Sequence, residues 1–149
     1  MHFVALGPDS LSPDPKVLAA AREAAKETGA IIEVCHDMKT AVKDADVLYT
    51  DVWASMGEEA QIPERVKQLT PYKVTMEMIE ATGNKDVLFL HCLPAFHDFE
   101  TKMAKAQKEK GFDIREVTDE VFRSRHSVVF DEAENRMHTI KAVMVATIA

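Results

Sequence analysis

Residues 91–98 carry four side chains that can do chemistry: His91, Cys92, His97 and Asp98. An imidazole can transfer protons near neutral pH, a thiol can donate a hydrogen bond or act as a nucleophile, and all four groups can bind metals. Neighbouring strand residues point to opposite faces, and no second ligand pair occurs elsewhere at metal spacing, so we expect no metal. We expect the Cys92 thiol to contact a substrate. The simpler alternative is a buried strand end with incidental polar residues.

Residues 51–57 form a second candidate group, directly after an apolar run. The Asp51 carboxylate can hold a cationic group, Ser55 can form hydrogen bonds, and Gly57 lets the backbone approach a ligand closely. Taken alone, Asp51 and Ser55 are better explained as caps of a following helix. A second reactive loop at a neighbouring strand end favours a ligand site.

Residues 131–136 form a third candidate group, at the start of the last predicted helix. Acidic residues suit a helix N-terminus, where the helix dipole is positive, but the cation of Arg136 does not. An arginine in this position beside a crevice indicates an anionic partner. The alternative is that Arg136 forms an i,i+4 ion pair with Glu132.

Each candidate group follows an apolar run of strand length. The runs comprise residues 3–6, 31–34, 47–50, 87–90 and 127–130, and the fourth is expected to be buried on both faces. Helical patterns separate them, and the last, residues 132–148, is apolar on every side from Ala142 to Ala146. Alternating strands and helices require crossovers and a parallel sheet. We therefore predict an α/β fold: a three-layer, Rossmann-like domain with a five-stranded parallel sheet, whose ligands bind beyond the carboxyl ends of the strands.

Short polar residues indicate where helices begin and end. Asp14, Asp37, Thr75 and Thr118 are predicted N-caps, since their side-chain oxygens can accept the first free N–H groups of a helix. Gly29 is predicted to end the first helix in the left-handed conformation.

Composition excludes several classes of protein. The 149 residues suffice for one domain with its own core. The 18 basic and 25 acidic residues give a net charge of −7, and no basic patch indicates a nucleic-acid surface. No apolar run could span a membrane, no signal peptide is evident, and two cysteines do not make a disulfide framework. We expect a cytoplasmic protein without a cofactor and without nucleic-acid or membrane partners.

Three motifs in this order resemble those of ornithine carbamoyltransferases. They are Asp51-x-x-x-Ser55-Met56-Gly57, His91-Cys92-Leu93-Pro94 and Phe130-x-Glu132-Ala133-Glu134-Asn135-Arg136. Residues 95–98 match the bacterial form. The resemblance covers residues 1–149 and corresponds to the second half of such an enzyme, its ornithine-binding domain. The Ser-x-Arg-Thr motif, by which the family's first domain binds carbamoyl phosphate, does not occur in this sequence.

For ornithine, the resemblance implies binding by Asp51, Ser55 and Met56, together with Cys92 and Leu93. Aspartate carbamoyltransferases carry His-Pro-Leu-Pro in place of the second motif, and putrescine carbamoyltransferases lack the Ser-Met-Gly loop. Both differences favour ornithine as the substrate of the protein to which this domain corresponds.

For carbamoyl phosphate, the resemblance implies contacts from Cys92, Leu93 and Arg136. The expected catalytic residues are Cys92, His91 and Arg136. Ornithine must lose its δ-ammonium proton before attack, and the thiolate of Cys92, if a cation stabilises it, or the imidazole of His91 could accept that proton. Carbamoyl phosphate is expected to bind only with the missing N-terminal domain, so we expect the lone domain to be inactive.

Family members assemble as trimers, so the resemblance implies a homotrimer or a larger assembly. Two alternatives remain from the residues. The chain could bind ornithine without turning it over, or it could be a flavodoxin-like signalling module with Asp51 as a phosphate acceptor. A receiver domain of that kind also needs an acidic pair after its first strand and a lysine after its fifth, and neither occurs at the corresponding positions here.

Overall fold

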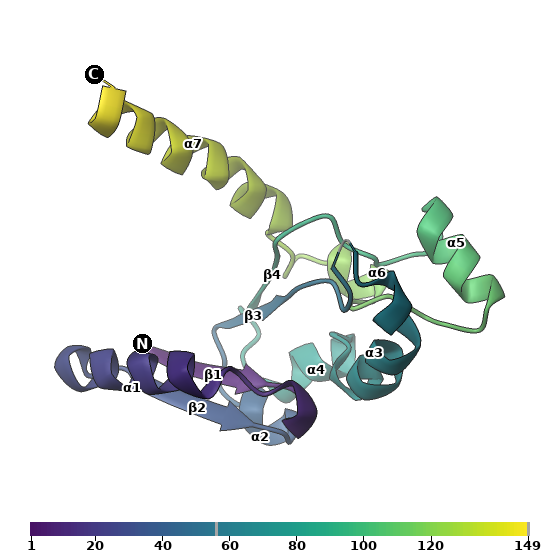
Figure 1. Cartoon of the computed structure of the whole chain (residues 1–149), viewed down its shortest axis with the longest axis horizontal. Coiled ribbons are helices and arrows are strands. Elements are labelled where there is room, and N and C mark those ends of the chain that lie inside the picture. The colour runs from purple at the N-terminus through teal and green to yellow at the C-terminus, as the bar shows by residue number, and fades with distance from the viewer. Residues whose placement is uncertain (56, 149) are drawn as a thin grey trace.

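The computed structural model of the chain describes residues 1–55 and 57–148. Its strands are β1 (His2–Leu6), β2 (Ile31–Cys35), β3 (Val47–Thr50) and β4 (Leu88–His91). Its α-helices are α1 (Pro15–Thr28), α2 (Met38–Val42), α3 (Ile62–Leu69), α4 (Met76–Ala81), α5 (Lys102–Glu109), α6 (Asp119–Phe122) and α7 (Val129–Ile148). Helices separate successive strands (Figure 1), which confirms the predicted α/β class.

The strands form two parallel pairs instead of the predicted five-stranded sheet. β1 pairs with β2, and β3 pairs with β4. Helical crossovers connect the partners of each pair, as parallel pairing requires. Within the described residues no ladder of backbone hydrogen bonds joins the two pairs.

The predicted fifth strand, residues 127–130, is wrong. In the described chain, this run contributes one parallel bridge, between Ser127 and Phe89. Helix α7 begins at Val129, three residues before the predicted start, and the Val128 carbonyl already accepts the N–H of Glu132 at 3.0 Å. An apolar run of four residues is equally compatible with a buried helix start, and Val129 is fully buried in that role.

All the predicted helix caps are confirmed. The carboxylates of Asp14 and Asp37 accept N–H groups in the first turns of α1 and α2. The hydroxyls of Thr75 and Thr118 do the same for α4 and α6. Gly29 ends α1 with φ 71°, in the left-handed region that glycine adopts without a steric penalty.

The paired strands β3 and β4 bury one face. Leu48 and Phe89 lie opposite each other in the register and belong to the main core. On the other face Val47, Tyr49 and Leu88 are 41–57% exposed. The prediction that residues 87–90 are buried on both faces is therefore wrong, because Leu88 of this run is 41% exposed. The main core comprises Val42, Leu48, Val74, Met78, Ile79, Val87, Phe89, Val117, Val121 and Val129.

Helix α7 points away from the rest of the chain (Figure 1). After its buried first residue, Val129, its apolar side chains are about half exposed or more, from Met137 at 52% to Ile148 at 76%. The described helices include none long and apolar enough to cross a membrane. The all-round apolar pattern of residues 142–146 thus forms part of an exposed apolar surface in this structure.

We expect this surface to cause self-association of the 149-residue chain. Apolar patches of this kind are usually covered in stable soluble proteins, and a second copy can cover them at sufficient concentration. Sedimentation velocity should show a mean mass that rises with protein concentration. Val143→Lys and Val145→Lys, both at exposed positions of α7, should reduce the association without unfolding the domain. A monomer at every concentration, with amide protection extending to Ile148, would contradict the prediction.

Candidate functional site

The parallel pairing of β3 with β4 brings two predicted site residues together. Thr50 and His91 are the last paired residues, so Asp51 and Cys92 follow side by side at the carboxyl ends of the strands. The Cys92 thiol donates a hydrogen bond to Asp51 Oδ1 at 2.9 Å. The same oxygen accepts the N–H of Val52 at 2.6 Å. Both side chains belong to exposed residues, so a ligand could reach them.

The environment of Cys92 is anionic. Partial burial, the hydrogen bond to Asp51 and the charges of Asp51 and Glu132 raise the pKa of the Cys92 thiol to about 11. The thiol is therefore protonated at neutral pH in this structure, and it acts as a hydrogen-bond donor. Both cysteines of the chain, Cys35 and Cys92, are free thiols.

We expect Cys92 to react slowly with iodoacetamide, because the thiolate is the reactive form. In a Cys35→Ser background, the alkylation rate should rise with pH toward a midpoint near the pKa of about 11. Asp51→Asn removes the negative charge that raises this pKa and leaves only a neutral acceptor for the thiol, so its midpoint should be lower and its rate at pH 9 higher. Equal rates in the presence and absence of the Asp51 carboxylate would contradict this assignment.

The His91 side chain is buried, and both of its ring nitrogens have partners. Nδ1 accepts the N–H of Leu93 at 3.0 Å, so the ring proton is on Nε2, which donates to Glu116 Oε1 at 2.9 Å. The side chains of His91 and Glu116 are both 0% exposed. The structure thus places His91 beneath the loop that carries Cys92 and Leu93, and its ring does not reach the surface.

The second predicted loop, residues 51–57, folds back on the acidic residues that follow it. The backbone N–H of Ser55 donates to Glu58 Oε2 at 3.1 Å, and that of Gly57 donates to Glu59 Oε1 at 3.2 Å. Gly57 has φ 90°, a conformation that favours glycine. Ser55 is exposed, and the predicted ligand residue Met56 lies outside the described residues.

The start of α7 contributes a carboxylate to the same end of the strands. Glu132 Oε2 accepts the backbone N–H of His91 at 3.0 Å. Burial raises the pKa of Tyr49, and the charges of Glu132, Cys92 and Asp51 raise it further. Arg136 lies one turn after Glu132 and is exposed. The i,i+4 ion pair considered for these two residues does not form among the described side chains, since Glu132 bonds to His91 instead.

His97 and Asp98 belong to a separate network. His97 Nδ1 lies 2.6 Å from Asp119 and 3.6 Å from Asp98, and its ring stacks on Phe122. These three groups have the spacing of metal ligands. Arg123 contacts both carboxylates, at 2.9 Å for Asp119 and 3.9 Å for Asp98, and supplies a positive charge to the cluster. The hydrogen bond from His97 lowers the pKa of Asp119.

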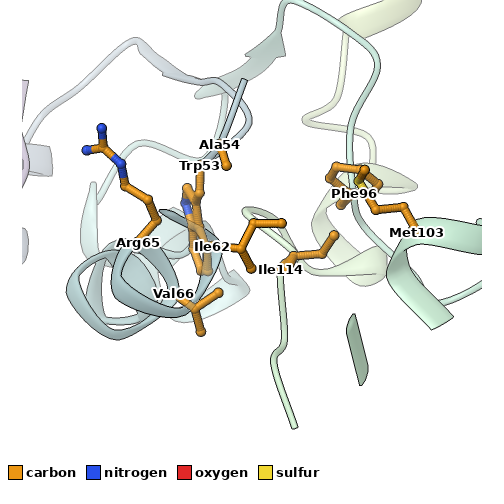
Figure 2. A pocket seen from close by; sticks show the side chains of 8 residues that line it. All are labelled: Trp53, Ala54, Ile62, Arg65, Val66, Phe96, Met103 and Ile114. Atoms are coloured by element: carbon orange, nitrogen blue, oxygen red, sulfur yellow. The ribbon is translucent and has the colours of Figure 1, made fainter. Parts of the chain in front are cut away.

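Apolar side chains from both loops line a small pocket (Figure 2). Trp53 and Ala54, which follow Asp51, face Phe96 of the loop after β4 across Ile62 and Ile114. Its lining does not suit a small cationic ligand, which needs carboxylates and other polar partners. We interpret the pocket as part of the packing that supports both loops, because Ile62 and Ile114 also form the second core cluster.

Two residues of this arrangement were not predicted from the sequence. In the sequence, the helix N-terminus accounts for Glu132, and no motif includes Glu116. The available signal for Glu116 was a carboxylate between Ile114 and Val117, which are both buried. Charged residues are rarely fully buried without a partner, so a Glu in such a segment indicates a specific hydrogen-bonding role.

Comparison with known families supports the same reading of the chain. Residues 1–147 match the family model described as aspartate/ornithine carbamoyltransferase, Asp/Orn binding domain. A catabolic ornithine carbamoyltransferase of Clostridium perfringens is 66% identical over 149 residues, which cover 99% of this chain and 45% of the relative. The corresponding Bacillus licheniformis protein is 56% identical over 142 residues, or 95% of this chain and 42% of the relative.

Solved structures of ornithine carbamoyltransferases are also similar to this chain. The ornithine carbamoyltransferase from Pyrococcus furiosus is 43% identical with a TM-score of 0.78, and the match covers 95% of this chain and 40% of that one. The anabolic enzyme from Campylobacter jejuni is 30% identical with a TM-score of 0.80, covering 97% and 42%. The chain thus spans less than half the length of the relatives it matches.

Proposed function

Because the chain belongs to the aspartate/ornithine carbamoyltransferase family, by its match to the Asp/Orn-binding domain, we propose that it is the L-ornithine-binding part of an ornithine carbamoyltransferase. The proposal treats residues 1–149 as one domain of an enzyme that also has a carbamoyl-phosphate domain. The observation that carries it is the meeting of Asp51 and Cys92 at the ends of β3 and β4.

L-Ornithine carries two ammonium groups and one carboxylate, and the proposed site supplies a negative charge for one of the ammonium groups. Asp51 is the proposed partner of an ammonium group, because a charge-assisted hydrogen bond is roughly twice as strong as a neutral one. Ser55, Met56 and Leu93 are proposed to surround the rest of the substrate. The protonated Cys92 thiol can donate a hydrogen bond where the two substrates meet, and its raised pKa supports this role over that of a base.

In the proposed reaction, the neutral δ-nitrogen of ornithine attacks the carbamoyl carbon of carbamoyl phosphate. A C–N bond forms and the C–O bond to phosphate breaks, which gives L-citrulline and inorganic phosphate. The δ-nitrogen loses one proton, which the departing phosphate can accept because its oxygen gains negative charge as the bond breaks. Arg136 is proposed to stabilise that charge or to orient the carbamoyl group, together with donors from the carbamoyl-phosphate domain.

His91 is proposed to position the loop that carries Cys92 and Leu93. Its ring is buried and both nitrogens are occupied by Leu93 and Glu116, so proton transfer with ornithine would require the loop to open. The further proposals for the complete protein are a homotrimer or larger assembly and a cytoplasmic location. The signalling alternative has less support, because the family match covers nearly the whole chain.

We expect L-ornithine to raise the melting temperature of the chain. At a ligand concentration of about 100 Kd, the stabilisation is about 2.7 kcal/mol, which is roughly 5–10 °C for a domain of this size. L-Norvaline is the matched ligand control, since it lacks only the δ-ammonium group, and L-aspartate tests the other branch of the family. Acetyl phosphate should not modify Asp51. Stabilisation by L-aspartate alone, or phosphorylation of Asp51, would count against the proposal.

A further inference from the structure

We propose that Glu116 is a positioning residue that holds the substrate loop, residues 92–95, in its ligand-binding shape. The inference deepens the proposed function and rests on it. Glu116 is 0% exposed and lies 25 positions from its partner His91 in the sequence. It does not touch the surface where ornithine is proposed to bind, so its action on the substrate would pass through the loop.

The backbone of Glu116 is fixed independently of the loop. Its carbonyl accepts the N–H of Val74 at 2.9 Å, and the Val74 carbonyl accepts the N–H of Thr118 at 3.0 Å. These bonds form a parallel bridge between Val74 and Val117 inside the main core. Glu116 therefore projects its carboxylate from a rigid support toward the end of β4.

One carboxylate oxygen of Glu116 binds both ends of the substrate loop. Oε1 accepts the Nε2–H of His91, which precedes the loop, at 2.9 Å. The same oxygen accepts the backbone N–H of Phe96, which follows the loop, at 2.6 Å. A single acceptor atom thus connects the two residues that flank residues 92–95.

The His91 ring extends this restraint into the loop. Its Nδ1 accepts the N–H of Leu93, and Leu93 has φ 40°, a left-handed conformation that is unfavourable for leucine. A residue keeps such a conformation only where its surroundings fix it. The bond from Nδ1 requires the proton to be on Nε2, and the Glu116 carboxylate favours that tautomer by accepting it.

The free-energy cost of burying the Glu116 carboxylate favours a specific hydrogen-bonding role for this residue over simple packing. A buried carboxylate is costly unless it is well hydrogen-bonded, and an apolar side chain of similar size would fill the space without that cost. Among the described residues, the partners of the Glu116 side chain are the two donors that flank the loop, and Oε2 has none. The carboxylate is therefore placed to serve the loop.

Two substitutions of Glu116 separate hydrogen bonding from packing. Glu116→Gln keeps an amide oxygen that can accept both N–H groups, whereas Glu116→Leu keeps a similar volume and removes the acceptor. Val117→Ala is the matched control, since Val117 is equally buried but contributes its side chain to the main core. The free 149-residue chain is used for the spectroscopy, and the same chain is titrated with L-ornithine by calorimetry.

In the wild-type chain, the ¹⁵N shifts of His91 should show the Nε2–H tautomer, and the amides of Leu93 and Phe96 should exchange slowly with solvent. Glu116→Leu should lose both signatures and bind ornithine about tenfold more weakly or worse. Glu116→Gln should retain both signatures with an affinity within about threefold of wild type, since a neutral acceptor loses only part of each bond. Val117→Ala should lower the melting temperature and leave the tautomer and affinity unchanged.

An unchanged His91 tautomer and unchanged loop protection in a folded Glu116→Leu chain would overturn the proposal. So would an ornithine affinity equal to that of wild type. If the wild-type chain does not bind ornithine, the proposed function fails for this chain, and the tautomer and exchange measurements still decide the role of Glu116.

Discussion

Replacing Asp51 with Asn is expected to weaken L-ornithine binding by about 10- to 100-fold, whereas Ser55→Ala should cost about tenfold or less. Hydrogen bonds to charged groups contribute about 1.5–3 kcal/mol and neutral ones about 0.5–1.5 kcal/mol, and each 1.4 kcal/mol is a factor of ten in affinity. Asp51 is the carboxylate that the β3–β4 register places beside Cys92. Asn keeps the shape of this side chain and removes its charge.

Isothermal titration calorimetry of both variants tests this difference. Asp86→Asn is the matched control, because Asp86 is exposed, precedes β4 and removes the same formal charge away from the site. Its affinity for ornithine should equal that of wild type. Equal losses in Asp51→Asn and Ser55→Ala would contradict the role of Asp51 as the ammonium partner.

The second large effect is the expected absence of catalysis by the 149-residue chain. Phosphate sites need several donors, commonly a helix N-terminus with basic side chains, and the sequence contains no Ser-x-Arg-Thr motif. Arg136 lies exposed on α7 and cannot by itself bind and orient carbamoyl phosphate. We therefore expect no citrulline above the uncatalysed background when the pure chain is supplied with both substrates.

A colorimetric citrulline assay checks this expectation, and the complete Clostridium perfringens relative, which is 66% identical over the shared part, serves as the positive control. The preparation must bind ornithine, so that a folded domain is tested. Citrulline formation that disappears in Asp51→Asn would show that this chain has a carbamoyl-phosphate site of its own.

The α/β order and the helix caps follow from local sequence. Asp14, Asp37, Thr75 and Thr118 cap helices because the side-chain oxygen and the free N–H groups are within three residues of each other. Local patterns cannot show which strands pair. The run 127–130 has the composition of a strand, yet the helix start at Val129 buries it equally well. Likewise, the continuous apolar run of residues 87–90 does not reveal that Leu88 is 41% exposed.

The sequence by itself was sufficient to identify the candidate site residues, because Asp51, Cys92 and Arg136 each occur in a recognisable short motif. The tertiary structure decided what these residues contact. Asp51 and Cys92 are 41 positions apart and meet only because β3 and β4 are parallel and in register. Glu132 and Glu116 bond to His91 across 41 and 25 positions, contacts that neither local sequence specifies. Hydrogen bonds over such separations depend on how strands and helices pack, and that packing decides which buried carboxylate meets which donor.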